Sequence, residues 1–207
     1  MAITTLFLDI GGVLLTNGWD TSARAEAAKL FHLNEKAMGE RHAQLFDLYE
    51  MGLISLDQYL DFVIFYEPRS FSKEQFKEFM FSCSKPHQEM IQLMVDIKKS
   101  RGVKMVAVSN EGRELMDWRI LRFKLDTFID FFVCSSFVGK KKPDPTFYRM
   151  ALDMCQTDPK NIVYIDDRPV LVEVGRTFGM QCICHQNVSA TRDALRQLGL
   201  ALLHKKI

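Results

Sequence analysis

The chain has 207 residues, of which 47% are hydrophobic, and its 27 lysines and arginines nearly balance its 26 aspartates and glutamates. This length and composition suit one sizeable hydrophobic core, or a main domain with a smaller one, and the net charge of +1 gives no reason to expect a nucleic acid or an anionic membrane surface as the main partner. No stretch reaches the roughly 18 apolar residues of a membrane span, and five scattered cysteines predict reduced thiols in a cytoplasmic protein.

The first predicted element is a short buried strand that ends at an aspartate. Residues 6–8 are Leu-Phe-Leu, and Asp9 follows them, two residues before a Gly-Gly turn at Gly11 and Gly12. A continuous apolar run of this kind is typical of a parallel strand that is covered on both faces. Ligands of open α/β sheets bind at the carboxyl ends of such strands, where an aspartate can act as a nucleophile or bind a hard cation. The alternative is an aspartate that caps an ordinary turn.

Residues 16–85 predict helices and no parallel strand. Apolar residues recur at helical spacing over residues 23–33 and 35–51. Ser55 and Ser72 each stand three residues before a glutamine, which is the pattern of a capping box at the start of a helix. We therefore predict four short helices inserted between the first strand and the rest of the sheet.

From Pro86 onward, helices and strands alternate, which predicts a parallel α/β sheet with right-handed crossovers. Pro86 suits the first turn of the next helix. The apolar run at residues 103–108 predicts a second buried strand, which brings Ser109 and Asn110 to the same edge as Asp9. A hydroxyl followed by exposed main-chain N–H groups suits a phosphate. The alternative is that Ser109 caps the following helix.

Two further strands are predicted to end near charged residues. Residues 131–134 precede a lysine-rich run, in which Lys142 stands before a proline and a helix start and is therefore held near the strand end. A lysine there acts as a point charge on a phosphoryl oxygen, although a solvated run of lysines is the alternative. Residues 161–165 end in Asp166 and Asp167, and two buried carboxylates are costly unless a cation or donors neutralise them. Magnesium, bound by oxygen, is the expected cation.

Four strand ends thus present a carboxylate, a hydroxyl, a lysine and an acidic pair. If they meet at one edge of the sheet, they supply a nucleophile, phosphate donors and a metal site. In-line phosphoryl transfer through an aspartyl-phosphate requires this combination.

These motifs resemble, in the same order and over nearly the whole chain, those of the haloacid dehalogenase-like (HAD) hydrolase superfamily. The resemblance is carried by Asp9, Ser109, the run Gly-Lys-Lys-Lys-Pro-Asp-Pro at 139–145, and Asp166-Asp167-Arg168. It implies an α/β fold with a Rossmann-like parallel sheet core formed by residues 1–15 and 86–207, and a small all-helical cap formed by residues 16–85.

The resemblance also implies a magnesium-dependent phosphatase acting on a small phosphorylated metabolite, such as a sugar phosphate. Asp9 would attack phosphorus, and Mg²⁺ would be held by Asp9, the Gly11 carbonyl and Asp167, with Asp166 in or next to the shell. The phosphoryl oxygens would be bound by Ser109, Lys142 and the main-chain amides of Ile10 and Asn110. Trp19, where the chain enters the cap, is predicted as a wall of the substrate pocket, with packing between cap and core as the alternative.

Two positions depart from the pattern of the family: Gly11, and Leu171, where the family often places an asparagine after the acidic pair. Most of its phosphatases carry a second aspartate two residues after the nucleophile as the general acid and base, whereas this chain has Gly11. Losing such a group typically costs about 10²–10⁴ in rate. A catalytically silent binding or regulatory protein is therefore one alternative. A metal-independent dehalogenase is another, but Asp166 and Asp167 would repel its anionic substrate. The sequence gives no prediction of the oligomeric state.

Overall fold

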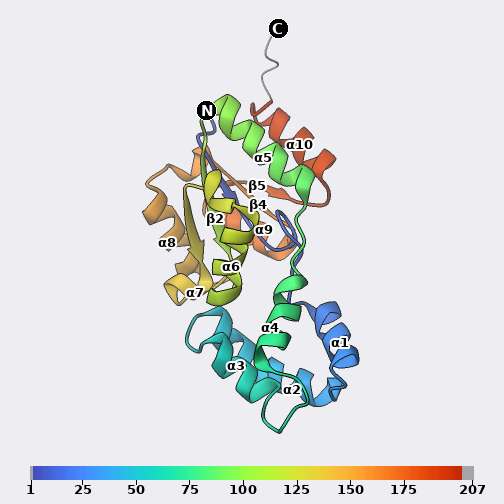
Figure 1. Cartoon of the computed structure of the whole chain (residues 1–207). Coiled ribbons are helices and arrows are strands. Elements are labelled where there is room, and N and C mark those ends of the chain that lie inside the picture. Colours follow the sequence, from blue (N-terminus) through green and yellow to red (C-terminus); the bar gives the residue numbers. More distant parts are fainter. Residues whose placement is uncertain (1, 202–207) are drawn as a thin grey trace.

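The computed structural model describes residues 2–201 and contains a five-stranded parallel sheet (Figure 1). The strands are β1 (Thr5–Leu8), β2 (Lys104–Ser109), β3 (Phe131–Cys134), β4 (Ile162–Asp166) and β5 (Gln181–Cys184). Their order across the sheet is β3-β2-β1-β4-β5, and every neighbouring pair is parallel. The predicted α/β fold is confirmed, and the carboxyl ends of all five strands lie at one edge.

Helices cover both faces of this sheet. They are α5 (Gln88–Arg101), α6 (Arg113–Phe123), the short α7 (Ser135–Val138), α8 (Pro145–Cys155), α9 (Pro169–Thr177) and α10 (Val188–Gln197). Successive side chains of a strand point to opposite faces, so Leu6 and Leu8 belong to a core cluster with residues of α5 and α10, while Phe7 belongs to a second cluster with residues of α8. This burial on both faces explains why β1 is apolar at every position.

Four helices between β1 and α5 lie together below the sheet in Figure 1 and are called here the helical insertion. They are α1 (Thr21–Leu30), α2 (Glu35–Glu50), α3 (Leu56–Val63) and α4 (Lys73–Ser82). Both capping boxes anticipated from the sequence are present: Ser55 opens α3 with Gln58, and Ser72 opens α4 with Gln75. The insertion encloses a hydrophobic cluster of its own, so its packing is largely internal.

Two short segments join the helical insertion to the sheet, and they run side by side. The Thr16 amide donates to the Lys85 carbonyl, and the His87 amide donates to the Leu14 carbonyl, both at 2.9 Å. The expectation that Pro86 lies in the first turn of a helix is wrong, because α5 begins at Gln88. Pro86 instead forms an isolated antiparallel bridge with Leu15 of the first joining segment. The hydrogen bonds of this pairing do not need the N–H that proline lacks.

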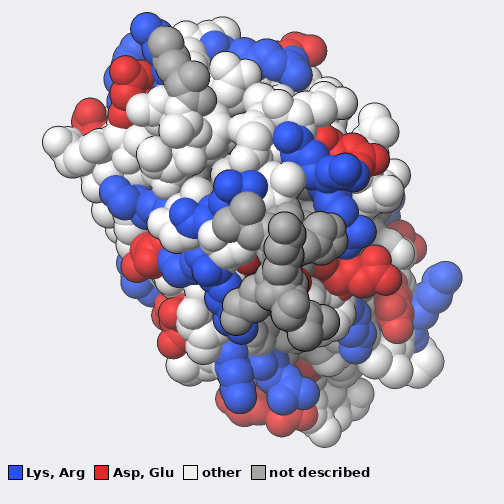
Figure 2. All heavy atoms as spheres, turned by 90° about the horizontal axis from the view of Figure 1, so that it is seen from above, with Lys and Arg blue, Asp and Glu red and all other residues white. Residues whose placement is uncertain are grey.

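In the described part of the chain, no helix is both long and apolar enough to cross a membrane. Figure 2 shows the end of the molecule that bears α5 and α10, seen from above. Basic and acidic side chains are interspersed over this face, as expected for a chain with nearly balanced charges.

Candidate functional site

The carboxyl ends of the three central strands bring the predicted site residues together. Asp9 directly follows β1, and Ser109 and Asp166 are the last residues of β2 and β4. The Ser109 hydroxyl donates to Asp9 Oδ1 at 2.6 Å. Asp9, Asp166 and Asp167 each offer a carboxylate oxygen within 4.8 Å of the others. Residues that are up to 158 positions apart in the printed sequence therefore form one cluster.

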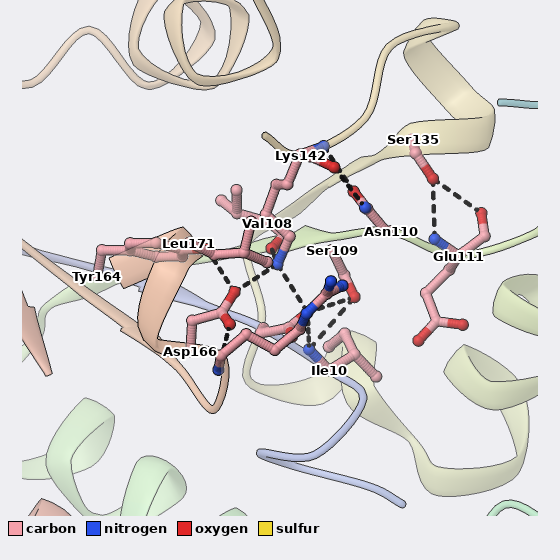
Figure 3. A network of polar contacts seen from close by, with 12 residues as sticks. Ile10, Val108, Ser109, Asn110, Glu111, Ser135, Lys142, Tyr164, Asp166 and Leu171 are labelled. Atoms are coloured by element: carbon pink, nitrogen blue, oxygen red, sulfur yellow. Dashed lines mark hydrogen bonds and ion pairs between the residues drawn. The ribbon is translucent and has the colours of Figure 1, made fainter. Parts of the chain in front are cut away.

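Lys142 reaches this cluster from the loop between α7 and α8 (Figure 3). Its ammonium lies 2.6 Å from Asp166 Oδ2 and 3.1 Å from Asp9 Oδ1, and it donates to the Val108 carbonyl at 2.9 Å. The Asn110 side chain holds the Lys142 main chain through two hydrogen bonds, at 2.8 and 2.9 Å. Burial lowers the pKa of Lys142, but the two carboxylates outweigh this effect and raise it above its usual value.

The Asp9 side chain is only 8% exposed, and three donors meet at one of its carboxylate oxygens. Besides Ser109 and Lys142, the Ile10 amide donates to Oδ1 at 2.9 Å. Oδ2 accepts no hydrogen bond from the described residues. Burial raises the pKa of Asp9 to about 6; Lys142 acts in the opposite direction and Asp166 in the same one.

The two carboxylates of the acidic pair differ in their surroundings. Asp166 is fully buried and accepts from Lys142, the Tyr164 hydroxyl and the Arg168 amide. Asp167 Oδ1 is also shielded from solvent but has no hydrogen-bond partner within residues 2–201. Burial and the neighbouring Asp166 raise the pKa of Asp167. From the sequence, we predicted a cation that offsets the charges of both carboxylates. Lys142 already offsets the charge of Asp166, so Asp167 is the carboxylate that still lacks a partner.

Gly12 allows the Asp167 carboxylate to lie close to the turn that follows β1. Its φ of +76° lies in the left-handed region, and a Cβ atom at this position would overlap the Asp167 carboxylate. A glycine therefore serves both the turn and the approach of the carboxylate. The three carboxylates form an all-oxygen donor set, which fits a hard divalent cation such as Mg²⁺.

These contacts bear on two of the alternatives left open by the sequence, the capping role of Ser109 and the solvated lysine run. Gly112, not Ser109, is the N-cap residue of α6, and it makes no side-chain capping bond. In the lysine run, Lys140 is largely exposed, Lys141 pairs with carboxylates of α2, and Lys142 is buried. The run is therefore not a uniformly solvated face.

A pocket of about 510 Å³ lies between the strand ends and the helical insertion. Its lining includes Asp9, Gly11, Asn17, Trp19, Arg24, Phe46, Tyr49, Glu50, Ser109, Asn110, Glu111, Lys142, Arg168 and Leu171. Trp19 lines this interface pocket, yet it is only 3% exposed and packs edge-on against Phe76 at 5.7 Å. Its Nε1 donates to the Tyr59 hydroxyl at 2.9 Å. Trp19 therefore packs within the hydrophobic cluster of the helical insertion and also borders the pocket, and its contact with a substrate stays a prediction.

Two buried charged residues of the site were not anticipated from the sequence. Glu111 lines the interface pocket, and its Oε1 lies 2.5 Å from Nη1 of Arg119, which is fully buried on α6. Burial raises the pKa of Glu111 to about 7, against the effect of Arg119. Arg119 also donates to the Ser84 hydroxyl and the Asn17 carbonyl, both at 3.0 Å. The only signal was the position of Arg119 on the apolar face of a helix.

Comparison with known proteins agrees with this arrangement. A model of the haloacid dehalogenase-like hydrolase family matches residues 3–179. The chain belongs to this family. It is 27% identical over 198 residues to flavin mononucleotide hydrolase 1 of Arabidopsis thaliana, with 91% of this chain and 78% of that protein covered. It is 29% identical over 124 residues to phosphoglycolate phosphatase of Aquifex aeolicus, with 60% and 53% covered.

Solved structures of HAD enzymes share the fold of this chain. A HAD family enzyme of Bacteroides thetaiotaomicron has a TM-score of 0.80 at 20% identity, covering 95% of this chain and 98% of that one. The same bacterial enzyme has been solved in complex with magnesium and inorganic phosphate. A structure described as a dehalogenase also matches, with a TM-score of 0.61 at 17% identity, 87% of this chain and 83% of that one covered. The HAD fold thus accompanies more than one reaction, and the site residues must decide between them.

Proposed function

We propose that this HAD hydrolase is a magnesium-dependent phosphatase that hydrolyses a small phosphorylated metabolite through an aspartyl-phosphate on Asp9. The observation that carries the proposal is the convergence of three donors on Oδ1 of Asp9, which lines the interface pocket and belongs to the acidic cluster with Asp166 and Asp167. The donors hold one oxygen in place, and Oδ2 is left to attack phosphorus. Positioning of a nucleophile in this way is a large part of phosphoryl-transfer catalysis.

The residues present fit a Mg²⁺ ion. Asp9, the Gly11 carbonyl and Asp167 would hold it, with Asp166 in or next to the shell, and the unpartnered Asp167 Oδ1 supports this assignment. Bound there, the ion would supply positive charge to the phosphoryl oxygens. The Bacteroides enzyme, which was solved with magnesium and inorganic phosphate, is consistent with the proposal.

The remaining polar groups would bind the phosphoryl group. Lys142 Nζ, the Ser109 hydroxyl and the main-chain amides of Ile10 and Asn110 are its donors in this proposal. The Asn110 side chain would hold Lys142 in place, since it already makes hydrogen bonds with both the amide and the carbonyl of Lys142. Charge-assisted bonds from such donors are roughly twice as strong as neutral ones.

We further propose that residues 16–85 act as a cap over a core of residues 1–15 and 86–207. Contacts between α2 and the segment from α7 to α8 support this division: Lys141 lies 2.5 Å from Asp47 and 2.7 Å from Glu50, and the Ser135 hydroxyl donates to the Glu50 carbonyl. Trp19 would form part of the wall around the leaving group. All five cysteines are free, which fits the predicted cytoplasmic location, although the name of the Arabidopsis relative assigns that protein to the chloroplast.

The test is turnover of p-nitrophenyl phosphate and of a panel of phosphorylated metabolites by the purified protein, with Mg²⁺ and with a chelator. We expect turnover that the chelator abolishes and that Asp9→Asn reduces by at least about 10⁴-fold, because the nucleophile itself is lost. Asp193→Asn, which removes an exposed carboxylate of α10, is the matched control. Halide release from a haloacid without metal would instead assign a dehalogenase. Retained Mg²⁺ binding without any turnover would assign a silent binding protein.

A further inference from the structure

Glu111 lies close to position 11, where most phosphatases of this family carry their second aspartate. A Cβ atom built on Gly11 would lie 3.3 Å from Glu111 Oε1 and 2.9 Å from Asn17 Oδ1. The space that a side chain at position 11 would enter therefore borders on a carboxylate from another part of the chain. Gly11 and Glu111 are 100 residues apart in the sequence, so the sequence pattern alone does not reveal this approach.

The surroundings of Glu111 hold it in place. Its main-chain amide donates to the Ser135 hydroxyl at 2.9 Å (Figure 3), and its side chain is 7% exposed. Oε1 pairs with the fully buried Arg119, whose other N–H groups are bound to the Ser84 hydroxyl and the Asn17 carbonyl. A guanidinium with this many partners gives the carboxylate one orientation, and Arg119 is thus a positioning residue.

Other carboxylates that line the interface pocket have different partners. Asp20 accepts the Ala23 amide as the N-cap of α1. Glu50 pairs with Lys141 at the contact between α2 and the core. Among these three, Glu111 is the one next to position 11, and it directly follows Ser109 and Asn110 in the chain.

We propose that Glu111 is the general acid and base of this hydrolase, supplied by the loop between β2 and α6 in place of a side chain at position 11. The inference rests on the proposed phosphatase function and names the residue that serves the leaving group in the same site. It accounts for a glycine at position 11 in a chain that keeps its other phosphoryl-transfer residues.

The two steps balance without a further reactant. In the first, Asp9 Oδ2 forms a bond to phosphorus, the bond from phosphorus to the leaving oxygen breaks, and that oxygen takes the proton of the Glu111 carboxyl. In the second, a water oxygen attacks the phosphorus of the aspartyl-phosphate and gives one proton to the Glu111 carboxylate. The bond between phosphorus and Asp9 breaks, and phosphate is released with both carboxyl groups restored.

The experiment compares wild type with Glu111→Gln during a single burst and during steady turnover of p-nitrophenyl phosphate. Nitrophenolate leaves without an acid, so we expect Glu111→Gln to retain a burst of about one nitrophenolate per protein. Steady turnover should then fall by at least about 100-fold, since an acid–base group contributes about 10²–10⁴. The phosphorylated protein should accumulate and carry one added phosphoryl group by intact mass. Asp117→Asn, an exposed carboxylate of α6, is the matched control and should behave as wild type.

Moving the carboxylate back provides a second measurement. In Gly11→Asp/Glu111→Gln, we expect steady turnover to recover by at least about 10-fold over Glu111→Gln. Gly11→Asp alone should gain nothing, because Glu111 already supplies the acid–base group. Glutamine could leave the Arg119 charge unpaired and destabilise the fold, so a third measurement uses wild type only. With an acid in place, kcat/KM should vary little across phenyl phosphates whose leaving phenols differ in pKa.

Each result decides the matter. A steep dependence of wild-type kcat/KM on the leaving group would overturn the proposal, and so would equal loss of burst and steady turnover in a folded Glu111→Gln protein, or no loss at all. In those cases wild-type turnover stands and only the role of Glu111 falls. If wild type turns over no phosphate ester, the proposed function falls and the role of Glu111 falls with it.

Discussion

The ammonium of Lys142 lies 2.6 Å from the carboxylate of Asp166, and both side chains are almost completely buried. A buried ion pair is costly to desolvate, yet removing one partner alone is worse because it leaves a charge without compensation. Lys142 therefore stabilises the fold of the site independently of any role in catalysis.

The first prediction follows from this pair. Lys142→Met leaves Asp9 and Asp166 facing each other without their shared cation, and we expect it to lower the free energy of unfolding by about 3–5 kcal/mol in metal-free buffer. Urea denaturation at neutral pH measures this change. Lys140→Met is the control, since the Lys140 side chain is 48% exposed and 3.7 Å from Asp144; it should cost less than about 0.5 kcal/mol. Equal costs for the two substitutions would contradict the prediction.

The second prediction concerns the metal. If Mg²⁺ binds the native site, a concentration 100 times its Kd raises the free energy of unfolding by about 2.7 kcal/mol. Asp167→Asn removes the carboxylate whose Oδ1 has no other partner, and we expect it to weaken Mg²⁺ binding by at least about 10-fold. Thermal denaturation over a Mg²⁺ titration gives both quantities, and calorimetry gives the Kd directly. An unchanged melting temperature of wild type at millimolar Mg²⁺ would argue against this site.

Much of the sheet could be predicted because its strands are buried on both faces. The run at residues 131–134 coincides with β3, and the predicted ends of β2 and β4 differ from the structure by one residue. The edge strand β5 was not predicted, since Gln181 is exposed and only Ile183 is buried among its four residues. Pro86 was misplaced because its surroundings are set by the neighbouring linker, which lies about 70 residues earlier in the chain.

The site divides in a similar way. Asp9, Ser109, Lys142 and the acidic pair were predictable because each stands at the end of an apolar strand or in the loop that follows one. Glu111 and Arg119 could not be predicted, because their roles depend on contacts with the segments that join the helical insertion to the sheet. The bond from Arg119 to the Asn17 carbonyl joins residues 102 positions apart, and no local pattern encodes it. The sequence also could not tell that Lys142 offsets the charge of Asp166.

The third prediction separates packing from substrate contact at Trp19. The ring belongs to the hydrophobic cluster of the helical insertion and is 3% exposed. Trp19→Ala should therefore cost about 3–5 kcal/mol in the free energy of unfolding, measured by urea denaturation. Trp118, half-buried on α6 and stacked on Phe81 at 5.4 Å, is the matched control, and its replacement by alanine should cost less. A loss below about 1 kcal/mol at Trp19, with a raised KM, would assign it to the pocket wall alone.

The fourth prediction concerns the contact that seats the helical insertion on the core. Tyr49 of α2 lies directly over Gly112, where a Cβ atom would overlap its ring. Gly112→Ala should therefore push α2 away from the N-terminus of α6 at a cost of about 1–3 kcal/mol, which is typical of overpacking. It should also lower kcat/KM by at least about 10-fold, because Glu111 and Asn110 stand just before this residue. Gly39→Ala is the control: position 39 faces open space on the same helix, so alanine there should stabilise the protein by about 0.5–1 kcal/mol. Thermal and urea denaturation of both variants, with kinetics on one phosphate ester, make the comparison. If Gly112→Ala behaves like Gly39→Ala, then α2 is not held against the core in solution as it is in the structure.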